Sequence, residues 1–244
     1  MNNADFTRAR AYYYEFLAFG FFFYGDDDSK FMVFKDQASY LAKSPINDDN
    51  KSDFEILSSA SFSEFKDEQN AVLFDLSYAN VPLNASFYDE GRDTGAQRLK
   101  VIEILKKSKY RRNLNKCQES EDFIGFILAL ISSFLKDSLN EDAKSIKKQN
   151  YNSLELANEL VKESLNPFID ELCELLNAHK DARIFKAIAN IMSSFLALER
   201  AYLNLKAPPK KAQSTAKTAL CMKPFKTKMP SAKSKIHWDE FSVL

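Results

Sequence analysis

Two neighbouring carboxylates, Glu121 and Asp122, are the residues of this sequence whose types and spacing could do chemistry. Two carboxylic acids can share general acid–base work when their surroundings hold one protonated and the other ionised. An acidic pair before an apolar run more commonly marks a helix start, because carboxylates favour the positive end of the helix dipole. The apolar run 123–135 follows, and Ser120 fits the N-cap position. We therefore interpret the pair as the first turn of a helix.

Other chemical signatures do not assemble by spacing. His179 and His237 have no cysteine, histidine or carboxylate at metal-ligand spacing. The three cysteines are widely separated and lack a CxxC pair, which indicates free thiols in a reducing compartment. The sequence has no GxSxG, HExxH, P-loop or GxGxxG pattern. We predict a protein that is not an enzyme, with no catalytic residues, no cofactor and no metal.

The run 123–135 contains no charged residue and ends before Lys136. A membrane span needs about 20 apolar residues, so this run is too short and predicts a helix buried on every side within a bundle. Its small residues follow a helical spacing that lets neighbouring helices approach closely, at Gly125, Ala129, Ser132 and Ser133.

Few glycines and prolines, with long segments of helical periodicity, predict an all-α protein. The segment 81–94 fits neither a helical nor a strand period, and a loop of this length between helices is more often functional than filler. The expected helices cover residues 4–24, 29–43, 53–59, 63–78, 94–109, 123–135, 154–164, 168–178 and 181–205.

The net charge of zero hides an asymmetry along the chain. Residues 207–244 hold eight lysines and two acidic residues, a net charge of +6, and the preceding 206 residues carry −6. The composition of the tail is typical of a disordered segment. We predict one all-α domain over residues 1–206 and a flexible basic tail over 207–244. The acidic body argues against a nucleic-acid surface and permits a basic peptide partner.

Residues 110–116 read YRRNLNK, which looks like a twin-arginine export motif before an apolar run. Export signals are N-terminal, and Glu119, Glu121 and Asp122 separate this motif from the run, so we interpret it as a solvated loop. The N-terminus carries charges before its apolar run and no small-x-small cleavage site. This pattern predicts a cytoplasmic protein.

Two motifs make the chain resemble a known family. Residues 81–88 read VPLNASFY, and residues 121–124 read EDFI. The combination resembles the TorD/DmsD/NarJ family of cytoplasmic molybdoenzyme chaperones, which shows a Pro-x-x-x-Ser-Val-Tyr-like loop and a Glu-Asp-His-Ile-Ala helix start. The resemblance covers about residues 4–206. Phe123 stands where the family motif has a histidine, and Ile127 where an acidic residue is expected.

The resemblance implies a TorD-like helical bundle that binds the twin-arginine signal peptide of a redox enzyme precursor until its molybdenum cofactor is inserted. A formate dehydrogenase or an S/N-oxide reductase is the implied type of client. Carboxylates would pair with the arginines, and aromatic side chains would hold the apolar segment. The peptide-binding residues implied are Pro82, Ser86, Phe87, Tyr88, Asp89, Glu90, Glu121, Asp122 and Phe123.

Two alternatives stay open. Phe87 and Tyr88 could simply anchor the loop, with Asp122 as a helix cap. The protein could also be a helical adaptor whose basic tail binds an acidic partner, such as nucleic acid or a membrane surface. For the chaperone we expect no nucleic acid, no stable membrane insertion, and a monomer or homodimer. The client and the role of the tail, including Trp238, are not predicted.

Overall fold

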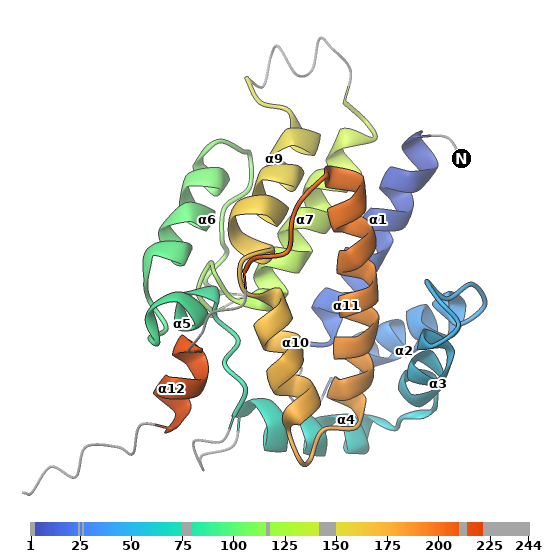
Figure 1. Cartoon of the computed structure of the whole chain (residues 1–244). Helices are drawn as coiled ribbons and strands as arrows, with labels where there is room; N and C mark the ends of the chain where they lie inside the picture. Colours follow the sequence, from blue (N-terminus) through green and yellow to red (C-terminus); the bar gives the residue numbers. More distant parts are fainter. Residues whose placement is uncertain are drawn as a thin grey trace, which may run out of the picture.

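The computed structural model describes residues 3–23, 25, 27–74, 80–115, 118–141, 150–209 and 214–221. Over these residues the chain is a single all-α domain, as the sequence predicts (Figure 1). The β-type pairing found among them is an isolated antiparallel bridge between Asn84 and Phe123. None of the helices in this part of the chain is long and apolar enough to cross a bilayer.

The helices run in order along the chain, and the π-helical turns η1 and η2 continue α4 and α9. Their bounds are α1 (Asn3–Phe19), α2 (Ser29–Leu41), α3 (Asn50–Ser59), α4 (Phe62–Gln69), η1 (Asn70–Phe74), α5 (Ala85–Glu90), α6 (Ala96–Lys106), α7 (Ile124–Ser138), α9 (Ser153–Leu160), η2 (Val161–Leu165), α10 (Ile169–Ala178), α11 (Ile184–Leu203) and α12 (Thr215–Cys221).

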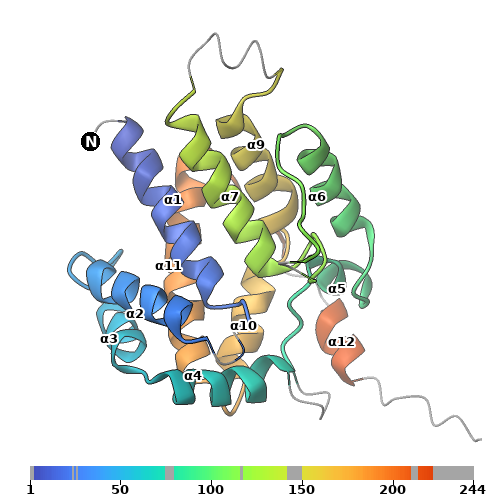
Figure 2. The ribbon, with the colours of Figure 1, turned by 180° about the vertical axis from the view of Figure 1, so that it is seen from behind.

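Helix α7 lies at the centre of the bundle, side by side with α1 and α9 (Figure 2). Most of its side chains are buried, which confirms the prediction of a core helix, but the helix is not buried on every side, because Phe126, Ala129 and Ser133 on one face are half-buried. The hydroxyl of Ser132 donates a hydrogen bond to the carbonyl of Ala11 at 2.8 Å. A small side chain at this position therefore lets α1 approach closely, as expected.

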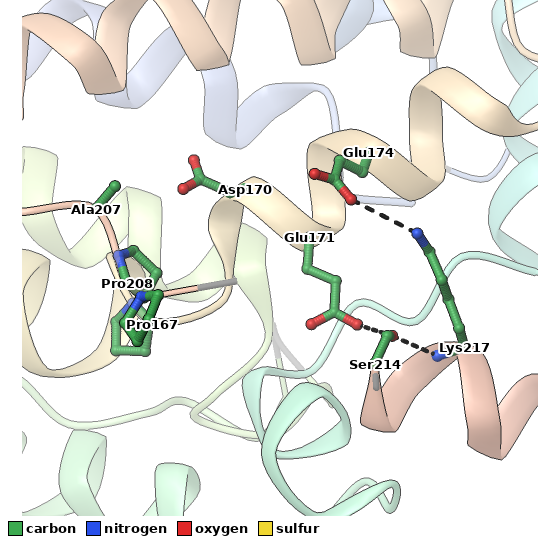
Figure 3. Close-up of a pocket in the computed structure, with 9 residues that line it drawn as sticks. Pro167, Asp170, Glu171, Glu174, Ala207, Pro208, Ser214 and Lys217 are labelled. Atoms are coloured by element: carbon green, nitrogen blue, oxygen red, sulfur yellow. Dashed lines mark hydrogen bonds and ion pairs between the residues drawn. The ribbon is translucent and has the colours of Figure 1, made fainter. Parts of the chain in front are cut away.

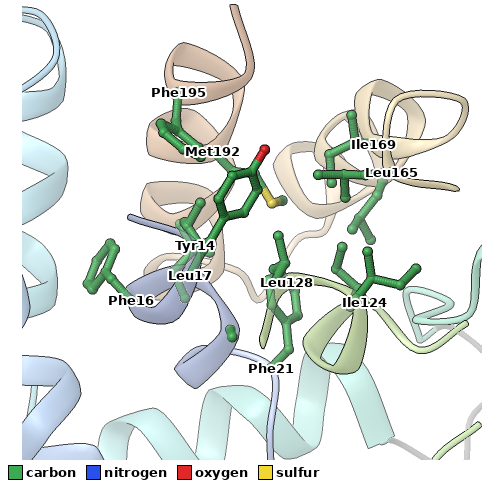
Figure 4. Packing of buried hydrophobic residues seen from close by; sticks show 14 of the residues in the cluster. Tyr14, Phe16, Leu17, Phe21, Ile124, Leu128, Leu165, Ile169, Met192 and Phe195 are labelled. Atoms are coloured by element: carbon green, nitrogen blue, oxygen red, sulfur yellow. The ribbon is translucent and has the colours of Figure 1, made fainter. Parts of the chain in front are cut away.

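Aromatic side chains fill much of the core. Tyr14 and Leu17 of α1 face Leu128 of α7 and Met192 of α11 (Figure 4). A second group joins α1, α2 and α4, with the rings of Phe16 and Phe34 stacked at 5.0 Å and those of Phe34 and Phe65 at 5.9 Å. Aromatic pairs of this kind add to the stabilisation that burial alone supplies.

A buried ion pair fastens α1 to α11. Arg10 Nε lies 2.6 Å from Glu199 Oε1, Arg10 Nη2 lies 2.8 Å from Oε2, and both side chains are 1% exposed. Tyr14 donates its hydroxyl to Glu199 at 2.8 Å, and Arg10 also donates to Asn158 of α9 at 3.1 Å. Burial and the charge of Glu199 raise the pKa of Tyr14 well above its ordinary value. The cluster therefore joins α1, α9 and α11 through buried polar side chains that are hydrogen-bonded to one another.

The structure corrects two predicted segments. Residues 81–94 are not wholly a loop, because α5 forms within them. Within the tail, residues Thr215–Cys221 form a helix, α12, whereas the sequence predicts a flexible segment there. The expected end of helix 63–78, the loop around 142–149, and the tail residues His237 and Trp238 fall outside the described residues.

Candidate functional site

The two motif segments are paired with each other. The amide of Ala85 donates to the carbonyl of Asp122 at 2.9 Å, and the amide of Ile124 donates to the carbonyl of Leu83 at 2.8 Å. These bonds flank the bridge between Asn84 and Phe123. The extended backbone that this pairing requires prevents the helix from starting at Ser120. Helix α7 therefore begins at Ile124, with Phe123 as its N-cap.

Asp122 caps a helix, but the helix is α5 and not α7. Its buried carboxylate accepts the backbone amide of Ser86 at 3.0 Å and the hydroxyl of Ser120 at 2.5 Å. Ser86 lies in the first turn of α5, whose amides have no partners within the helix. The predictions of Ser120 as N-cap and of the acidic pair in the first turn of α7 are therefore wrong. Asp122 holds the start of α5.

Glu121 is occupied by two arginines of the same chain. Its carboxylate lies 2.6 Å from Arg98 Nε and 3.1 Å from Arg112 Nε. Burial opposes the charged form, but the hydrogen bond from Arg98 and the charges of both arginines outweigh it, so the pKa of Glu121 lies below its ordinary value. Arg112 also donates to the carbonyl of Glu119. The interpretation of residues 110–116 as a solvated loop is therefore wrong for Arg112.

The aromatic residues of the motifs point inward. Tyr88 is 2% exposed, its hydroxyl donates to the carbonyl of Pro82 at 2.7 Å, and its ring lies 5.2 Å from that of Phe168 at the start of α10. Burial raises the pKa of Tyr88 well above its ordinary value. Phe123 is also buried, with its ring edge-on to Phe22 at 5.5 Å. These side chains anchor the motifs to the core.

The remaining predicted residues reach the surface on α5. Phe87 is half-buried, and Asp89 and Glu90 are exposed. Asp89 accepts a hydrogen bond from Gln97 at 3.2 Å. Glu90 accepts the amide of Ala96 at 2.5 Å and caps α6, so that this bond and Arg92 hold the pKa of Glu90 below its ordinary value. Of the nine predicted residues, Asp89 and Glu90 are exposed, Pro82 and Phe87 are half-buried, and Tyr88 reaches the wall of a cavity.

A groove runs from α5 to α10, and we call it the α5–α10 groove. One cavity of about 220 Å³ includes Tyr88 and Asp89 in its wall, and a second of about 310 Å³ lies over α10 (Figure 3). The two cavities share Pro167, Pro208 and Pro209. The carboxylates of the second cavity come from one face of α10, at Asp170, Glu171 and Glu174.

Sequence reasoning missed this acidic face. The signal was present, since residues 170, 171 and 174 recur at helical spacing within a segment correctly predicted as helix. Asp170 is held by Arg200, whose Nη1 and Nη2 each lie 2.9 Å from one of its carboxylate oxygens. Within the described residues, no group of three histidine, cysteine or acidic side chains could hold a metal ion.

A comparison with known protein families matches residues 54–174 to the nitrate reductase delta subunit family. The match includes both motifs and the start of α10. The chain belongs to this family. Its members are maturation chaperones of molybdoenzymes and not catalysts. No curated protein and no solved structure matches the chain.

Proposed function

We propose that this chaperone-family chain binds the twin-arginine signal peptide of a molybdoenzyme precursor in the cytoplasm and holds the precursor until its cofactor is inserted. The α5–α10 groove is the site. The observation that carries this proposal is the position of α5, which the pairing of the two motifs fixes against the start of α7 and the contact of Tyr88 with Phe168 sets beside the start of α10.

The groove offers what such a peptide needs. A twin-arginine peptide presents two guanidinium groups and an apolar, helix-prone segment. Guanidinium groups form their strongest hydrogen bonds with carboxylates, and Asp89, Glu171 and Glu174 supply these around the two cavities. The walls that Tyr88 and Phe168 contribute suit the apolar segment, in the manner of a helix bound in a groove.

The predicted residues then divide into two groups. Phe87, Asp89 and Glu90 are exposed enough to contact the peptide. The others set the position of α5, because their side chains are buried or, for Pro82, because the backbone carbonyl accepts the hydroxyl of Tyr88: Pro82, Ser86, Tyr88, Glu121, Asp122 and Phe123. The client is a formate dehydrogenase or an S/N-oxide reductase type of enzyme.

Calorimetric titration with twin-arginine peptides from the same genome tests the proposal. We expect one of these peptides to bind, and a version with both arginines changed to glutamine to bind at least tenfold more weakly, since each lost charge-assisted hydrogen bond contributes about 1.5–3 kcal/mol. If none of the peptides produces heat, or if the glutamine version binds equally well, the proposed function is wrong.

A further inference from the structure

The tail helix α12 lies in the α5–α10 groove. Ser214 donates its hydroxyl to Glu171, and Lys217 Nζ lies 3.5 Å from Glu174 Oε2 (Figure 3). Ala216 is fully buried. On the other side, α12 packs against α5, so close that a methyl group added at Gly91 would lie 3.3 Å from Ala219 Cβ.

This segment has the chemistry that the groove is proposed to bind. Helix α12 presents small apolar residues on one side and a cation near its middle, and it belongs to a tail of net charge +6. Its partner face on α10 is acidic, at Glu171 and Glu174. Charge complementarity and burial of Ala216 thus place a basic–apolar helix of this chain where a basic–apolar signal peptide would dock.

The contacts that hold α12 are weak and easily exchanged. A seven-residue helix is too short to be stable alone, since isolated helices below about 12–15 residues are marginal in water. Its ion pair is exposed, with side-chain exposures of 52% for Lys217 and 46% for Glu174. The cavity of about 310 Å³, which Ser214 and Lys217 line together with α10, shows that the segment leaves space beside α10 in the groove. A partner with larger side chains would bury more apolar surface there.

We infer that the α5–α10 groove is a docking site for a basic–apolar helical segment, and that α12 is an intramolecular occupant which the signal peptide must displace. This inference rests on the proposed function for the identity of the competing peptide. If α12 occupies the groove in about nine-tenths of the molecules, about one-tenth of them can bind the peptide, and the apparent affinity for the peptide is about tenfold weaker. The tail therefore keeps weak, non-client peptides out of the groove.

Full-length variants test the inference without removing the tail. In Lys217→Glu the side chain faces Glu174 with the same charge, so α12 should leave the groove, and we expect about tenfold tighter binding of the twin-arginine peptide. Lys180→Glu is the matched control, because it makes the same charge change at an exposed position beyond the end of α10. We expect its affinity to change less than about twofold. Equal affinities of Lys217→Glu and wild type would overturn the inference.

Hydrogen exchange separates this inference from the proposed function. When the peptide binds wild-type protein, the amides of residues 217–221 should exchange faster, and unchanged exchange there contradicts displacement. If no twin-arginine peptide binds, the proposed function is wrong, and a synthetic peptide of residues 207–244 still tests the groove. If adding this peptide to the Lys217→Glu variant slows hydrogen exchange of the α10 amides, the result supports the docking site. Unchanged exchange in α10 would overturn the docking site.

Discussion

The Arg10–Glu199 pair and the Lys217–Glu174 pair join a cation and a carboxylate between helices, yet they differ in burial and in consequence. The first is 1% exposed on both sides and is surrounded by further hydrogen bonds. The second is about half exposed and 3.5 Å long. Removing one partner of a buried pair leaves an uncompensated charge, whereas an exposed pair exchanges readily with water. The Arg10–Glu199 pair therefore stabilises the helical bundle, whereas the Lys217–Glu174 pair can be replaced when a peptide competes with α12 for the groove.

The largest effect is expected at the buried pair. Glu199→Ala should lower the free energy of unfolding by about 3–5 kcal/mol, because Arg10 then remains buried without its carboxylate. Denaturant unfolding followed by circular dichroism measures this loss. The double variant Arg10→Met/Glu199→Leu is the control, and it should recover most of the stability. A loss below about 1 kcal/mol in Glu199→Ala would show that the pair does not fasten α1 to α11.

A smaller effect is expected at the cap of α5. Asp122→Ala should cost about 1–3 kcal/mol, because the buried amide of Ser86 loses its acceptor, and it should weaken peptide binding by misplacing α5. The matched control is Asp89→Ala, an exposed carboxylate on α5 itself, which should change stability by less than about 0.5 kcal/mol while still weakening peptide binding. If Asp122→Ala leaves peptide affinity unchanged, Asp122 is a cap and nothing more.

The expected loss at Glu121 lies between those at the buried and the exposed pair, and the contribution of Glu121 to stability depends on pH. Its pKa is lowered in the folded protein, so its stabilising effect is present above the ordinary glutamate pKa and is lost as the pH falls through the lowered value. Glu121→Gln should therefore cost on the order of 1 kcal/mol at pH 7 and less at pH 3. Urea unfolding at the two pH values measures this, and an equal cost at both would contradict the paired, ionised state.

The smallest effect on stability is expected at the exposed pair. Lys217→Ala should change the free energy of unfolding by less than about 0.5 kcal/mol, while peptide affinity rises because α12 is held less firmly. Thermal unfolding and calorimetry together check both parts. A large drop in stability would mean that α12 is an integral part of the domain and cannot be displaced.

The features that the sequence predicts are those that local pattern determines. The apolar run 123–135 became α7, and helical periodicity found the long helices. Helix α5 was not predicted because its six residues need Asp122 to accept the amide of Ser86, and Asp122 lies 36 positions from Ser86 in the sequence. Helix α12 was not predicted because a lysine-rich composition indicates disorder. The contacts that stabilise it, with α5 and α10, are tertiary and leave no local pattern in the sequence.

The candidate site could be predicted only in part, because its arrangement depends on contacts between residues far apart in the sequence. The motif residues were identified by resemblance, but their spacing cannot reveal that Tyr88 and Asp122 turn inward. Nor can it reveal that Arg98 and Arg112 occupy Glu121, because these partners meet only through the fold. The acidic face of α10 could have been found from the spacing of its carboxylates, although its position beside α5 could not.

Calorimetric titration of one twin-arginine peptide into the wild-type chain and into Lys217→Glu tests the central claim most directly. The account predicts binding to both proteins, about tenfold tighter to the variant, and strongly reduced in both when the peptide arginines are changed to glutamine. Absence of heat with either protein, across the twin-arginine peptides of the same genome, would contradict it.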